Sequence, residues 1–177
     1  MLNREFKSDK PNEKWLTDVS EFKYGTGDDE KKGKIYLSVI LDLCGKRPVA
    51  YEYSDHNDNP LVFNTFDKAL AANPGATPLF HSDRGYQYTS KTFRQKIIDA
   101  GISQSMSRVA RCIDNGPMEG FWGIMKREMY YTKKYQTKEE LIQAIHKYMN
   151  YYTNRRVQRK LNVLTPMEYH KKMMLVA

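Results

Sequence analysis

Hydrophobic and polar positions first follow the spacing of strands along the chain, and later that of helices. Segments 15–24, 35–43 and 48–53 are rich in β-branched and aromatic residues, and polar or glycine-containing stretches separate them. Gly45 and Lys46 fall between the last two segments. Short apolar runs bounded by such turns predict three strands joined as an antiparallel meander.

Helical periodicity begins after the meander. Apolar residues recur at three- and four-residue spacing over 60–73, and a short apolar strand follows at 78–82. Thr89 or Ser90 can cap a second helix that Gly101 ends, and residues 102–105 are expected to form an edge strand. Three strands, a helix, a strand and further helices predict an α/β layered domain.

The C-terminal half is predicted to be helical. Pro117 suits the first turn of a helix, and that helix carries an apolar stripe of Met118, Phe121, Trp122, Met125 and Met129. A helix over 137–152 opens with the Thr-Lys-Glu-Glu pattern of a capping box at Thr137, and Thr165 precedes a last short helix. Segment 107–115 lacks periodicity and contains two arginines, Arg108 and Arg111, which is the profile of a mobile loop near a ligand.

Length and charge narrow the class of protein. A chain of 177 residues fits one domain, and its net charge of +8 favours a polyanionic partner. From Glu119 onward there are twelve Lys or Arg against five Asp or Glu, together with seven of the thirteen tyrosines. Basic groups interleaved with aromatic rings suit a nucleic-acid track, while a solvated basic face with half-buried tyrosines is the alternative.

The cysteines and the hydropathy of the sequence argue against several classes of site and location. Cys44 and Cys112 form neither a disulfide framework nor a zinc pattern. The sequence has no long apolar run and no signal peptide, so we expect a cytoplasmic protein without a membrane partner. Residues 1–12 read as a linker from something missing upstream, 13–153 as the domain, and 154–177 as a basic tail with a short helix.

Three carboxylates are the candidate chemistry. Asp18 lies in the first strand, Asp83 follows the end of the 78–82 strand, and Glu119 borders the apolar stripe with Lys126 seven residues later. Each has an ordinary reading: a solvent-facing strand residue, a turn aspartate, or a surface glutamate paired with a surface lysine. Together they form the hard oxygen set that Mg²⁺ prefers.

The motifs that contain these residues carry a family resemblance. WLTDVSEF, YLSVILDL, HSDRGYQY, DNGPMEGFWGIMKRE and YYTNRRVQRKLNVLTPMEY together resemble the catalytic core of bacterial insertion-sequence transposases of the IS-three kind, over residues 11–172. Those enzymes belong to the retroviral-integrase superfamily. The resemblance implies a ribonuclease H-like α/β fold, with a mixed five-stranded sheet flanked by helices.

The same resemblance implies a reaction and its residues. Asp18, Asp83 and Glu119 match the family's catalytic and metal-binding triad, with 35 residues between the second and third acids. Mg²⁺ or Mn²⁺, as two ions, is the implied cofactor for cleavage and strand transfer of transposon-end and target DNA by a homo-oligomer on the bacterial nucleoid. The assigned DNA contacts are Lys126, Arg127, Arg84, Tyr88, Asn115, Arg155 and Arg156. Apart from the resemblance, His81 stands two residues before Asp83 and should point to the same side of the strand, so it is a candidate supporting residue behind the triad, with an ordinary core or surface histidine as the alternative.

The chain departs from many relatives in two ways. The tail has Thr153 and Gln158 where many relatives have Asn and His, which resembles one subgroup, and the chain has no room for the helix-turn-helix region of longer relatives. Its DNA binding is therefore expected to be mostly nonspecific and salt-sensitive. A ribonuclease H-type hydrolytic nuclease and an inactive integrase-like DNA-binding module are the two competing functions.

Overall fold

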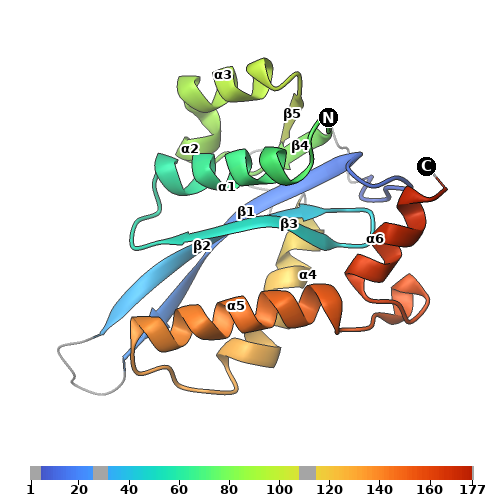
Figure 1. The fold of residues 1–177 in the computed structure, drawn as a ribbon. Helices are drawn as coiled ribbons and strands as arrows, with labels where there is room; N and C mark the ends of the chain where they lie inside the picture. The colour runs from blue at the N-terminus through green and yellow to red at the C-terminus, as the bar shows by residue number, and fades with distance from the viewer. Residues whose placement is uncertain (1–4, 26–31, 108–114, 177) are drawn as a thin grey trace.

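A five-stranded sheet with the order β3-β2-β1-β4-β5 forms the middle layer of the molecule (Figure 1). The computed structural model describes residues 5–25, 32–107 and 115–176. β1, β2 and β3 pair antiparallel, whereas β4 pairs parallel with β1 and β5 parallel with β4. The strands are β1 (Lys14–Tyr24), β2 (Gly33–Asp42), β3 (Arg47–Ser54), β4 (Leu79–Ser82) and β5 (Ser103–Met106).

Helices cover both faces of this sheet. Figure 1 shows α1 (Asn59–Ala72), α2 (Tyr86–Thr89) and α3 (Lys91–Asp99) on one face. α4 (Gly116–Met125) and α5 (Lys138–Asn154) lie on the other face, and α6 (Pro166–Met174) lies beside the turn between β2 and β3. The mixed five-stranded sheet flanked by helices, which the family resemblance implied, is confirmed.

The alternation of side chains along β1 divides the core in two. Leu16 and Phe22 pack with α4 and α5, whereas Trp15 packs with α1 and α3 on the opposite face. Because successive side chains of a strand point to opposite faces, the even-numbered positions of β1 face α4. Asp18 is one of these positions, so the fold turns it toward the helix that carries Glu119.

α4 does not continue as a regular α-helix. It runs into a π-helical turn, η2 (Lys126–Tyr130), in which the Tyr131 N–H donates to the Lys126 carbonyl over 2.8 Å. Such a turn holds one residue more than an α-helical turn. The predicted apolar stripe of α4 and η2 is nevertheless confirmed, since Met118, Phe121, Trp122, Met125 and Met129 are all buried.

The predicted elements match the structure apart from a few local features. The sequence patterns did not predict α2 or the short 3-10 helix η3 (Arg159–Leu161). Ser90 caps α3 as one of the two predicted candidates. The capping box predicted at Thr137 is only half formed, because Glu140 accepts from the Gln136 N–H instead of that of Thr137.

The remaining expectations concern the start of the last helix, the loop over 107–115 and membrane-spanning helices. A complete capping box occurs at Thr165 and Glu168, at the start of α6. Arg108, Arg111 and Cys112, in the predicted mobile loop, lie outside the described residues. No helix in the described ranges is long and apolar enough to cross a membrane.

Candidate active site

β1 and β4 carry the two aspartates on neighbouring parallel strands. Leu16 of β1 pairs with His81 of β4, so extending this register by two residues brings Asp18 opposite Asp83. Asp83 follows the last residue of β4, and its side chain is exposed. Its Oδ1 accepts a hydrogen bond from the Gly85 N–H over 2.8 Å, which holds the carboxylate at the turn after the strand.

Glu119 approaches from the opposite layer. It lies in the first turn of α4, exposed at the edge of the buried stripe. Trp122, on the same helix, donates from its indole Nε1 to Asp18 Oδ2 over 3.0 Å. This hydrogen bond joins the strand of the first acid to the helix of the third.

The electrostatics of Asp18 reflect its surroundings. Burial, together with the nearby charges of Asp83 and Glu119, raises its pKa from 3.8 to about 6, while hydrogen bonds from Val19 and Trp122 partly oppose the rise. Among the residues that the structure describes, no Lys or Arg forms an ion pair with any of the three acids. The cluster thus carries negative charge that no described Lys or Arg neutralises.

The three acids are close enough to influence one another but are not assembled into a finished metal site. In the described part of the chain, no group of three or more His, Cys, Asp or Glu side chains is arranged to hold a metal ion. Their donor chemistry nevertheless suits a hard divalent cation, since all three are carboxylates and one is partly buried without a compensating Lys or Arg among the described residues.

Lys126 lies over the same face of β1 as Asp18. Its ammonium group stands 5.2 Å from the ring centroid of Phe22, the residue four positions after Asp18. The Lys126 N–H still bonds to the Trp122 carbonyl, so the helix is regular from Glu119 up to this point. The predicted placement of Glu119 and Lys126 on one helix face therefore agrees with the backbone.

The other predicted DNA contacts divide into exposed and occupied side chains. Arg84, Arg127 and Arg155 are exposed, and Arg84 Nε donates to the Ser107 carbonyl over 2.8 Å beside Asp83. Arg156 instead forms a bidentate ion pair with Glu128, with N···O distances of 2.7 and 2.9 Å. That pair occupies its guanidinium group within the protein.

Two predicted contacts are buried. Tyr88 is 2% exposed, and its hydroxyl lies 3.1 Å from Thr17 Oγ1, next to Asp18. Burial raises its pKa well above the ordinary range. Because it is buried, Tyr88 is not available as a DNA contact in this conformation; its ring packs in the core beside β1. Asn115 is 8% exposed; its Nδ2 lies 3.5 Å from the Thr17 carbonyl, and its Oδ1 has no hydrogen-bond partner.

His81, on β4, is buried beside the end of β5. Its Nδ1 lies 3.1 Å from Ser105 Oγ and its Nε2 lies 3.2 Å from Ser107 Oγ. Its role behind the triad stays a prediction. The bond from Trp122 to Asp18 was missed because the apolar stripe accounted for Trp122 as a core residue, although its indole N–H is a donor that buried sites use.

Comparison with known proteins adds independent information. A family model described as an integrase core domain matches residues 8–112, and a second model of the same description matches residues 119–174. An uncharacterized transposase-like protein of Haemophilus influenzae is 40% identical over 96% of this chain and 76% of its own length. A putative transposase of insertion sequence element IS150 from Escherichia coli is 39% identical over 96% of the chain and 58% of its own length.

Solved structures are similar in fold. The HTLV-2 integrase catalytic core domain in complex with magnesium has a TM-score of 0.71 and 20% identity, covering 93% of this chain and 99% of that domain. A chain in the structure of the simian T-cell lymphotropic virus intasome in complex with PP2A regulatory subunit B56 gamma has a TM-score of 0.76 and 18% identity, covering 93% of this chain and 56% of that one. These similarities confirm the predicted ribonuclease H-like fold class.

Proposed function

Because the chain belongs to the integrase core domain family, as the catalytic domain of an insertion-sequence transposase, we propose that it cleaves and joins DNA strands with the help of divalent metal ions. Asp18, Asp83 and Glu119 are the proposed ligands. When bound, Mg²⁺ or Mn²⁺ supplies a Lewis acid that stabilises charge on the attacking and leaving oxygens at a phosphodiester.

The setting of Asp18 is the observation that carries this proposal. A half-buried carboxylate whose pKa is raised to about 6 by burial and by two neighbouring acids is costly to keep ionised. No described Lys or Arg offsets the cost. Such an arrangement is explained if the cluster is built to receive a cation from outside the chain.

The surrounding residues have supporting roles in this proposal. Trp122 holds Asp18 through its indole N–H, and the Gly85 N–H holds Asp83. Lys126 and Arg127, on the helix that carries Glu119, would position phosphates near the acids. Asp83 and Glu119 are exposed, and we propose that their side chains would reorient toward Asp18 so that all three acids could hold a metal ion.

A nicking and joining assay tests the proposal. The chain is incubated with supercoiled plasmid and a labelled DNA end in the presence of Mg²⁺ or Mn²⁺. Asp83→Asn should abolish both nicked and joined products, because it removes an exposed ligand while its amide oxygen can keep the Gly85 hydrogen bond. Asp67→Asn, an exposed aspartate of α1 outside the triad, is the matched control.

Each outcome of this assay separates the functions. Full activity of Asp83→Asn would contradict the triad assignment. Nicked product without any joined product from the unaltered chain would favour the hydrolytic nuclease. Calorimetry with Mn²⁺ gives a second test, since absence of binding heat would favour the inactive DNA-binding module.

The proposal extends to partners. The related structures include an intasome and a trimeric form of an integrase core. We propose that this chain acts on transposon-end and target DNA as a homo-oligomer. Sedimentation with and without DNA would test the assembly.

A further inference from the structure

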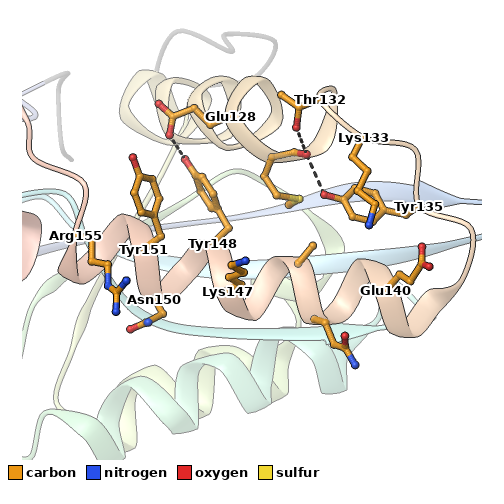
Figure 2. Close-up of a pocket in the computed structure, with 13 residues that line it drawn as sticks. Glu128, Thr132, Lys133, Tyr135, Glu140, Lys147, Tyr148, Asn150, Tyr151 and Arg155 are labelled. Carbon is orange, nitrogen blue, oxygen red and sulfur yellow. Dashed lines mark hydrogen bonds between the residues drawn. The ribbon is translucent and has the colours of Figure 1, made fainter.

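A hollow lies between η2 and α5, away from the three carboxylates. It encloses about 1030 Å³, and Figure 2 shows that η2 with the following turn forms one wall and α5 the other. None of Asp18, Asp83 and Glu119 lines it. The proposed active site therefore leaves this groove without a function.

Tyrosines form the aromatic part of the groove. The Tyr148 hydroxyl donates to Glu128 Oε2 over 3.0 Å, and the Tyr135 hydroxyl donates to the Met129 carbonyl over 3.0 Å. Both rings are thus fixed in place. Tyr151, whose ring centroid lies 6.1 Å from that of Tyr148, is 43% exposed and presents a ring to the solvent side of the groove.

The groove has a positive charge that its own acids do not cancel. Lys133, Lys147 and Arg155 line it, are exposed, and form no ion pair with any described acid. Glu128, at the same groove, is already neutralised by the bidentate pair with Arg156. Glu140 accepts the Gln136 N–H, and a single carboxylate can offset only one of the three cations.

We infer that the groove between η2 and α5 binds a single DNA strand. Lys133, Lys147 and Arg155 would contact backbone phosphates, and Tyr151 would stack on an unpaired base. An aromatic ring beside cations is the arrangement that binds single strands without reading their sequence. The inference rests on the proposed function only in taking DNA as the polyanion.

The position of the groove relates it to the proposed chemistry. Glu128 follows Glu119 by nine residues along one continuous helical segment, which spans about 14 Å at 1.5 Å per residue. Because each helical residue turns by about 100°, Glu128 also lies on a different side of the helix from Glu119. A strand that leaves the reacting phosphodiester unpaired would therefore pass around this helix to reach the groove.

Competing occupants differ in the contacts that they would use. An acidic peptide would be held by the cations but would gain little from an exposed ring. A DNA duplex presents paired, stacked bases whose faces are not open to Tyr151. A second copy of the chain would bury the tyrosines without needing the three cations.

Fluorescence anisotropy with a short labelled oligothymidylate tests the inference. The measurement is made in chelator, so that neither metal nor catalysis contributes. Tyr151→Ala should weaken binding about ten-fold, whereas Tyr151→Phe, which keeps the ring, should bind like the unaltered chain. The double change Lys147→Gln and Arg155→Gln should weaken binding and make its salt dependence shallower, by about 0.7 in slope for each lost phosphate contact.

Controls and contrary results are defined in advance. Lys91→Gln, an exposed charge change on α3, should leave the affinity unchanged. Equal affinity of Tyr151→Ala and the unaltered chain would overturn the inference, as would equally tight binding of duplex DNA or effective competition by polyglutamate. Groove variants that alter sedimentation without altering DNA affinity would assign the groove to self-association instead.

The same assay separates this inference from the proposed function. Asp83→Asn removes the proposed chemistry but should keep the affinity for the oligothymidylate. Loss of strand binding in the groove variants with normal metal binding would support the groove alone. Normal groove binding with no metal binding would support the groove and contradict the triad.

Discussion

Replacing Asp18 with asparagine should make the metal-free chain more stable at neutral pH. In the folded protein the pKa of Asp18 is raised from 3.8 to about 6, first by burial and then by Asp83 and Glu119. At 1.36 kcal/mol for each pKa unit, ionising it in the folded state costs up to roughly 3 kcal/mol. Asparagine removes that charge and keeps an oxygen that can accept the Trp122 hydrogen bond.

The sign of the pH dependence follows from the raised pKa. The folded protein binds this proton more tightly than the unfolded chain, so the cost is full above pH 6 and disappears as the pH falls toward 4. We expect Asp18→Asn to raise the free energy of unfolding by about 1 to 3 kcal/mol at pH 7.5. At pH 5 the gain should be about half as large.

Urea unfolding followed by circular dichroism, in chelator at the two pH values, measures this effect. Asp83→Asn is the matched control, since Asp83 belongs to the same cluster but is exposed, and it should change the stability little. Adding Mn²⁺ should stabilise the unaltered chain and not the Asp18→Asn variant. A variant that is less stable than the unaltered chain at pH 7.5, or whose gain does not change with pH, would refute the reasoning.

Three further substitutions test other contacts by urea unfolding. Trp122→Phe removes the donor to Asp18 and should lower the free energy of unfolding by about 1.5 to 3 kcal/mol at neutral pH, and by less at pH 4. Trp15→Phe is the control: it loses a hydrogen bond to the neutral Asn12 side chain, so its effect should not depend on pH in this way. Thr165→Ala breaks the capping box of α6 and should cost about 1 kcal/mol; an unchanged stability would show that α6 does not belong to the cooperative unit. Gly45→Ala should cost about 1 kcal/mol or more, because Gly45 has a φ of +82° and a β-carbon there would lie 2.9 Å from the Tyr169 ring; a neutral result would mean that α6 can shift away.

Local patterns predicted most of the fold. The β-branched and aromatic residues of 15–24 predicted β1, and Pro117 marked the start of α4 because its ring suits a first turn. The 35-residue separation of Asp83 and Glu119 was part of a motif set, and the comparisons confirm the family that it indicated. Residues close together in the sequence were sufficient to predict the features that depend on a single helix or strand.

Long-range pairing was not predictable in this way. Arg156 meets Glu128 from 28 residues away, and Trp122 meets Asp18 from 104 residues away, so no local spacing indicates either bond. Tyr88 lies in the motif of Asp83, but the unpredicted turn α2 directs its ring into the core. The groove between η2 and α5 likewise depends on how two helices pack.

The π-helical turn at η2 divides one helix into two halves that can change independently. Deleting one residue from Lys126–Tyr130 would restore regular α-helical winding. Residues before the turn, including Glu119, would keep their orientation toward β1, whereas the side chains of the turn itself, Glu128 among them, would take new positions around the helix axis because one residue fewer completes the turn. Sequence length at this turn therefore provides a way to reshape the groove in a designed or evolved variant while the proposed metal ligands stay in register.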